Sequence, residues 1–67
     1  MNFKDITDKV AIITDFAERM GYDTNEAFFF DPDSGRPCYE IALAGTRDTN
    51  GEEYSWTWYL DTGEEIW

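Results

Sequence analysis

The stretch EAFFFDPDSGRPCYEIALAG, residues 26–45, decides the fold that we expect for this chain. Residues 26–31 favour a short aromatic strand. Residues 31–37 are turn-forming, because proline fixes φ, aspartate and serine cap locally, and glycine permits a positive φ. Residues 38–45 alternate between large and small or polar side chains, which is the period of a strand. The large side chains on one face are those of Tyr39, Ile41 and Leu43. We therefore predict an antiparallel β-hairpin.

A second loop and a third strand follow this hairpin. Residues 46–53, TRDTNGEE, are polar and contain an Asn-Gly pair, a strong turn signal. Residues 53–60, EYSWTWYL, alternate again and predict a strand. Its large side chains on one face are those of Tyr54, Trp56, Trp58 and Leu60. Residues 61–63 turn the chain, and EEIW, residues 64–67, can form a short fourth strand.

An amphipathic helix is predicted before the strands, over residues 3–20. Apolar residues recur there at spacings of three and four, which places them on one stripe. The stripe consists of Ile6, Val10, Ile13, Phe16, Ala17 and Met20. Ile12 lies off the stripe and is expected to be exposed. Gly21 stands where helices end in a left-handed residue.

The order of these elements predicts a single α+β domain, residues 1–67, with one N-terminal amphipathic helix packed on a three- to four-stranded antiparallel sheet. One helix covers one face of such a sheet, so the other face has no covering element. Phe28, Phe29 and Phe30 cannot all face the helix, and some aromatic area should lie on the open side. That area serves either cross-strand pairing or a partner surface.

Composition limits how the domain is stabilised and where it resides. Cys38 is the single cysteine, histidine is absent, and twelve aromatic residues are present. A disulfide within the chain and a Cys/His zinc site are thereby excluded, so aromatic burial is the expected source of stability. The N-terminus lacks the pattern of a signal peptide, and a single cysteine fits a reducing compartment. We expect a soluble, cytoplasmic protein.

The net charge of −10 is the strongest functional signal in the composition. It argues against binding to nucleic acid or anionic membrane, since both bind preferentially to basic surfaces. It favours a basic partner, although an acidic surface can also serve solubility alone. No Lys or Arg follows Arg47, so the acids of the last segment are expected to lack a neutralising neighbour.

Catalytic and metal-binding patterns are not found in the sequence. Without histidine a base tuned near neutral pH is missing, and Cys38 stands at an alternating strand position typical of a buried, inert thiol. The acidic loops after Asp31 and Asp48 place glycine and glutamate wrongly for an EF-hand. We therefore expect a protein that is not an enzyme and has no cofactor and no metal.

Carboxylates are the remaining candidates for functional side chains. Alternate residues of a strand lie ~6.6 Å apart on one side, and phosphates along DNA advance ~3.4 Å per base pair, so rows of acids can approach the charge density of a nucleic-acid backbone. The acids form two groups in the sequence: Asp23, Glu26, Asp31 and Asp33, and then Asp48, Glu52, Glu53, Asp61, Glu64 and Glu65. The candidate partner-binding residues are Asp31, Asp33, Asp48, Glu52, Glu53, Asp61, Glu64 and Glu65, with Tyr59 as an aromatic anchor.

The whole chain resembles the small acidic anti-CRISPR proteins of phages, in particular those that mimic double-stranded DNA. The resemblance rests on size, on the charge of −10, and on a helix followed by an aromatic sheet with the acidic loops DTNGEE and DTGEEIW. It implies inhibition of a Cas effector in a bacterial host cell, by occupation of a basic PAM- or DNA-recognition surface. Two alternatives stay open: an immunity-type inhibitor of a nuclease toxin, and an acidic structural or adaptor protein with an aromatic dimer interface.

Overall fold

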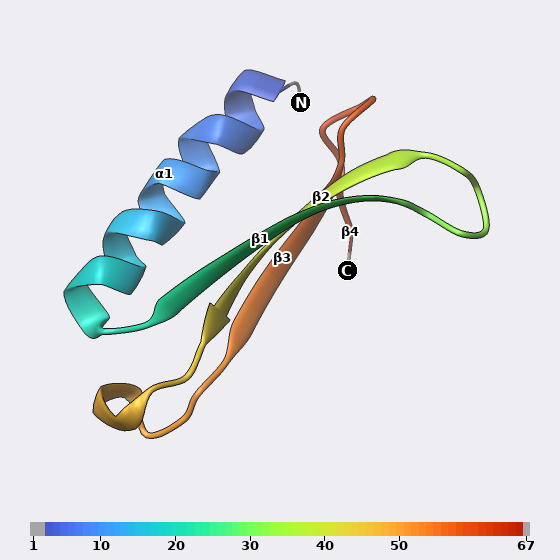
Figure 1. The fold of residues 1–67 in the computed structure, drawn as a ribbon. Helices are drawn as coiled ribbons and strands as arrows, with labels where there is room; N and C mark the ends of the chain where they lie inside the picture. Colours follow the sequence, from blue (N-terminus) through green and yellow to red (C-terminus); the bar gives the residue numbers. More distant parts are fainter. Residues whose placement is uncertain (1–2, 67) are drawn as a thin grey trace.

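The computed structural model describes residues 3–66 as one helix on a four-stranded antiparallel sheet, with the strand order β1-β2-β3-β4 (Figure 1). The elements are α1 (Phe3–Met20), β1 (Asp23–Phe30), β2 (Pro37–Ala44), a 3₁₀ turn η1 (Arg47–Thr49), β3 (Tyr54–Tyr59) and β4 (Glu65–Ile66). The predicted α+β fold is confirmed. Trp67, which the sequence assigns to the fourth strand, lies outside the described residues, as do the side chains of Phe3, Lys4 and Asp48.

Helix α1 has the predicted bounds and the predicted ending. Gly21 adopts φ 85°, and the carbonyl oxygen of Ala17 accepts hydrogen bonds from the N–H groups of Gly21 and Tyr22, both at 2.9 Å. A carbonyl of the last turn thus accepts bonds from the residues after the helix, which is how a left-handed residue closes a helix C-terminus. Asp15 and Arg19 form an exposed ion pair one turn apart, at 3.1 Å. The helix is neither long nor apolar enough to cross a membrane, and it is the one helix that the described residues form besides the η1 turn.

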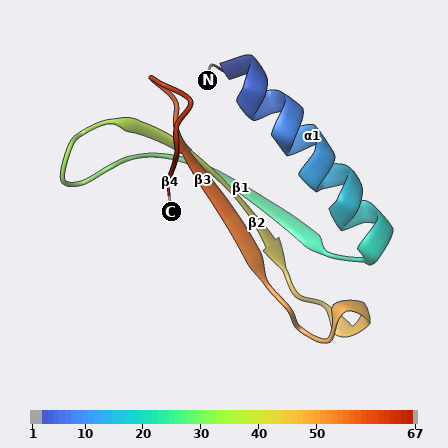
Figure 2. The same cartoon turned by 180° about the vertical axis from the view of Figure 1, so that it is seen from behind.

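The core lies between α1 and the middle of the sheet. Ile6, Tyr39, Ile41 and Trp58 are its buried members, and Val10, Ile13, Trp56 and Leu60 pack against them. The strand register explains the grouping, because Tyr39 is opposite Trp58 and Ile41 is opposite Trp56, so these side chains share the face toward α1. The predicted alternation of the second and third strands is therefore confirmed. Figure 2 shows the same arrangement from behind, with α1 along one side of the sheet.

The predicted helical stripe is wrong at its C-terminal end. Phe16 is 43% exposed and Met20 is 52% exposed, whereas Ile6 and Ala17 are buried. Phe16 lies against Tyr22, with ring centroids 5.7 Å apart, and it lines a shallow groove with Tyr54 and Trp56 of β3. Phe16 and Met20 thus lie at the margin of the contact between helix and sheet, whereas Ala17 between them is buried.

The turn between β1 and β2 has the expected local chemistry. The Asp31 carboxylate accepts hydrogen bonds from the Ser34 hydroxyl at 2.7 Å and from the Asp33 N–H at 3.2 Å. Gly35 adopts φ 73° and donates its N–H to the Asp31 carbonyl at 2.7 Å. Strand β1 begins earlier than predicted, at Asp23, because the register with β2 continues uninterrupted down to Ala44.

Candidate functional site

Negative charge is concentrated on the sheet and its loops. Residues 21–67 contain eleven of the fifteen carboxylates but only two of the five basic residues, and residues 1–20 contain the rest. The helix side of the molecule is consequently near electrical balance. A basic partner would therefore be attracted mainly to the sheet and to the turns at its two ends.

One group of acids, here called the distal acidic cluster, lies where the β1–β2 turn meets the β3–β4 turn. Its members are Asp31, Asp33, Asp61 and Glu64. Arg36 joins the two turns: its Nε donates to Asp61 Oδ2 at 3.0 Å and its Nη2 donates to Asp61 Oδ1 at 2.9 Å. The same Nη2 reaches the Thr62 hydroxyl at 3.2 Å, and the Leu60 N–H donates to the Pro37 carbonyl at 2.9 Å.

This arrangement corrects the expectation that the last acids lack a neutralising neighbour. Arg36 is distant in sequence from Asp61, yet it pairs with that carboxylate through two hydrogen bonds, the geometry in which an arginine holds a carboxylate most firmly. The hydrogen bond from Arg36 lowers the pKa of Asp61. The hydrogen bonds from the Ser34 hydroxyl and the Asp33 N–H lower the pKa of Asp31. Both carboxylates therefore stay ionised in mildly acidic solution.

Tyr59, the predicted aromatic anchor, lies beside the distal acidic cluster but is covered. The Arg36 guanidinium carbon lies 3.5 Å from the centre of the Tyr59 ring, a cation–π arrangement. The ring is half-buried. Its role in this structure is thus to hold the arginine in place, and little of its face is free for a partner.

A second group, here called the loop acidic cluster, lies at the opposite end of the sheet. Its members are Asp23, Glu52 and Glu53. The Glu52 carboxylate accepts hydrogen bonds from the Tyr54 hydroxyl at 3.0 Å and from the Tyr22 hydroxyl at 3.4 Å. The bond to Glu52 raises the pKa of Tyr54. Asp48, a further predicted residue, belongs to the same loop, but its side chain lies outside the described part of the chain.

The grouping of acids by sequence is therefore wrong. Glu52 and Glu53 precede β3, whereas Asp61 and Glu64 follow it, and Figure 1 shows the two connections at opposite ends of this strand. Glu65 belongs to neither cluster. It is half-buried opposite Trp58, on the face that α1 covers, where it lines a depression together with Lys9.

An apolar patch extends from the loop acidic cluster along α1 and β3. Its members are Ile12, Ile13, Phe16, Tyr54 and Trp56, which line a shallow groove without polar lining. Ring contacts connect Phe16 to Tyr22, Tyr22 to Tyr54, and Tyr54 to Trp56. The exposed aromatic next to these acids is Tyr54, whereas the residue predicted from the sequence is Tyr59.

A second exposed aromatic surface lies on β1. Phe29 is on the open face of the sheet, as the alternation predicts, but Phe28 and Phe30 are on the helix side and are still 68% and 73% exposed. Phe28 contacts the neighbouring Tyr39 ring, at 4.9 Å between centroids. Sequence alternation could not reveal this exposure, because it depends on where α1 lies across the sheet.

Groups suited to covalent chemistry are sparse in the described residues. Cys38 is buried, with its thiol 3.5 Å from the Arg36 carbonyl oxygen. Within residues 3–66 no group of three or more His, Cys, Asp or Glu side chains is arranged to hold a metal ion. The surface features of the chain are therefore charge and exposed aromatic area.

Comparison of the chain with protein-family models, with curated proteins and with solved structures finds no match.

Proposed function

We propose that this chain is a non-catalytic inhibitor of a bacterial CRISPR–Cas effector, which it binds in the host cytoplasm as an acidic mimic of DNA. The observation that carries the proposal is the placement of acids at both ends of one elongated body. The molecule measures 37 × 24 × 17 Å, and −10 of net charge is distributed mainly over its sheet and loops. The target surface is the basic PAM- or DNA-recognition surface of the effector.

The spacing of the two clusters supports this mechanism. Strand β3 separates them and spans six residues, which corresponds to roughly 17 Å at ~3.3 Å per residue. Phosphates along one DNA strand cover the same distance in about five base pairs, at ~3.4 Å each. Carboxylates at the two ends can therefore occupy phosphate sites in one basic groove. Arg36 holds Asp61 of the distal acidic cluster in position before binding.

The same acids would serve an immunity-type inhibitor of a nuclease toxin, because its partner surface is also basic. A specific observation favours the third possibility, an adaptor that dimerises: the apolar patch of α1 and β3 has no cover. However, each of the two copies would carry a net charge of −10. Repulsion between them opposes association at physiological salt.

Charge reversal at each cluster tests the proposal. We expect Glu52→Lys with Glu53→Lys, and separately Asp33→Lys with Glu64→Lys, to weaken binding to the effector by roughly tenfold or more, or ~1.4 kcal/mol. A matched control is Asp15→Lys with Glu18→Lys, which changes the net charge equally on the exposed face of α1.

The measurement is displacement of fluorescent target DNA from the effector at two salt concentrations. Titration of the wild-type protein should give a sharp equivalence point, because the inhibitor acts without turnover. Equal losses of affinity in the control and in both cluster variants would show that only the net charge matters, and not the position of the acids. Salt-insensitive binding that is unaffected by either reversal would refute DNA mimicry.

A further inference from the structure

Strand β1 is an open edge of the sheet. It pairs with β2 alone, and all eight of its residues are exposed. The opposite edge, β4, has only two residues. Edge strands are usually protected by lysine, proline, a bulge or a short length. β1 has no lysine or proline, and its register with β2 runs from Asp23 opposite Ala44 to Phe30 opposite Pro37 without a bulge.

The phase of the β1–β2 ladder shows which backbone groups point to the edge. Asp31 donates its N–H to the Arg36 carbonyl at 2.9 Å, so this pair is hydrogen-bonded. Hydrogen-bonded and non-hydrogen-bonded pairs alternate along an antiparallel ladder, and Phe30 is opposite Pro37, which has no N–H to donate. The residues that direct N–H and C=O groups away from β2 are therefore Thr24, Glu26, Phe28 and Phe30.

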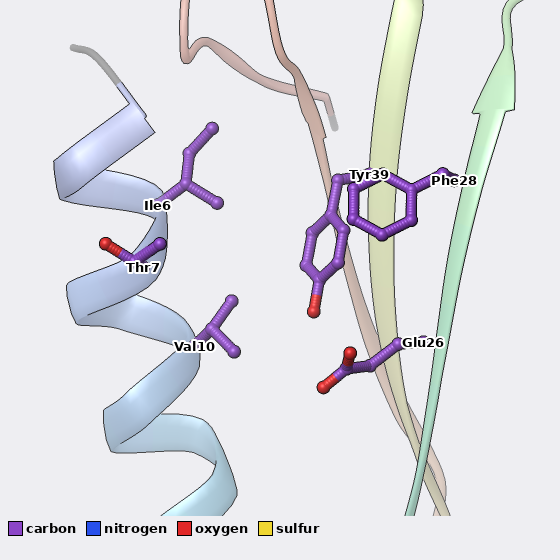
Figure 3. Close-up of a pocket in the computed structure, with 6 residues that line it drawn as sticks. All are labelled: Ile6, Thr7, Val10, Glu26, Phe28 and Tyr39. Atoms are coloured by element: carbon purple, nitrogen blue, oxygen red, sulfur yellow. The ribbon is translucent and has the colours of Figure 1, made fainter.

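An apolar groove runs beside this edge, on the face toward α1. Ile6, Thr7 and Val10 of the helix form one wall, and Glu26, Phe28 and Tyr39 form the other, as Figure 3 shows. Its volume is about 230 Å³. A strand that paired with β1 would turn every second side chain toward this face of the sheet, where the groove and the exposed Phe28 ring could receive apolar groups.

The charged residues of β1 and of the turn as far as Asp33 are all acidic. Asp23 and Glu26 belong to the strand, Asp31 and Asp33 follow it, and the first basic residue after Arg19 is Arg36. A second copy of this chain would bring the same acids to the edge, which disfavours self-pairing. A basic strand would instead meet carboxylates toward the two ends of the edge.

We propose that β1 is a docking edge for an extended segment of a partner protein in which Lys or Arg alternates with apolar residues. The segment adds a fifth strand through the outward N–H and C=O groups of β1, a known mode of peptide recognition. Its apolar side chains enter the groove between α1 and Phe28. Its basic side chains alternate onto the opposite face of the sheet, toward Asp23 at one end of β1 and Asp31 at the other. This inference goes beyond the proposed function, because it does not require the partner to bind DNA.

The test uses ¹⁵N-labelled protein and a capped synthetic peptide of alternating lysine and valine as the probe. In the free protein the amides of Thr24, Glu26 and Phe28 should exchange rapidly, and those of Asn25 and Ala27 should be protected by β2. Saturating peptide should slow exchange at the outward amides by about tenfold or more. Unchanged exchange at these amides, or no chemical-shift change at millimolar peptide, overturns the proposal.

Two controls separate strand addition from simple charge attraction. The same peptide with N-methylated amides keeps its side chains and charge but loses its donors, and it should bind at least about tenfold more weakly. A protein synthesised with N-methyl-Phe28 loses one outward N–H donor but no hydrogen bond to β2. It should bind the peptide more weakly, while its near-ultraviolet circular dichroism is unchanged. Equal affinity of the methylated and unmodified peptides contradicts the docking edge, even if both bind.

Discussion

Arg36 determines the electrostatics of the distal end of this molecule. It holds Asp61 through two hydrogen bonds and lies over Tyr59. The hydrogen bond from Asp61 raises the pKa of Arg36 further above its ordinary value, so the guanidinium stays charged at every accessible pH. Any pH dependence of this contact therefore comes from the carboxylate.

The pair predicts a specific loss of stability in acid. The pKa of Asp61 is lower in the folded chain than in the unfolded chain, so its stabilisation is present above the unfolded value and is lost as pH falls through the folded one. We expect the wild type to be more stable than Asp61→Asn at about pH 6 and the difference to shrink towards about pH 2. Urea denaturation of both proteins across this range measures it. A difference that is constant with pH would show that Arg36 does not lower the pKa of Asp61.

At the scale of elements, α1 contacts the core of the sheet through Ile6, Val10 and Ile13. Ile6 is buried against Tyr39, Ile41 and Trp58, whereas Phe16 and Met20 near the end of the helix are exposed. The helix thus leaves two grooves, one toward β1 and one toward β3. The exposed aromatic surfaces follow directly from this attachment.

Two isoleucines of the same helix provide a matched test of this attachment. Ile6 is 2% exposed and Ile12 is 70% exposed. We expect Ile6→Ala to lower the free energy of unfolding by about 2–5 kcal/mol, and Ile12→Ala to change it by no more than about 0.5 kcal/mol. Chemical denaturation measures both values. Similar losses at the two positions would mean that α1 packs on the sheet with a different face.

At the scale of the whole molecule, self-repulsion opposes folding. A compact chain with −10 of net charge brings its carboxylates closer together than the unfolded chain does. The exposed acids of the loop acidic cluster have tyrosine hydroxyls nearby, and hydroxyls do not cancel their charge.

Salt should therefore have opposite effects on stability and on binding. Raising NaCl from about 0.1 M to 1 M shortens the screening length from ~10 Å to ~3 Å. We expect the urea midpoint of the free protein to rise, because repulsion among carboxylates is screened. Affinity for a basic partner should fall over the same range. A urea midpoint that falls with added salt would show that attractive ion pairs outweigh the repulsion.

The helix and the strands of this protein follow from local patterns in its sequence. The three- and four-residue spacing of apolar residues specified α1, Gly21 specified its end, and the alternation around Tyr39 and Trp58 specified the strands and their inward faces. These are local signals, because the period of a helix or strand is set by its own backbone geometry. The turn between β1 and β2 is equally local, since Asp31, Ser34 and Gly35 contact one another.

The surfaces that these elements expose depend instead on how the elements pack together. The pairing of Arg36 with Asp61 joins two turns that are distant in sequence, and it divides the acids into two clusters that their order in the chain does not show. The exposure of Phe16, Phe28 and Phe30 depends on where one helix lies across a four-stranded sheet. That position is set by how Ile6 packs among Tyr39, Ile41 and Trp58, and such packing is a property of side chains brought together from three separate segments.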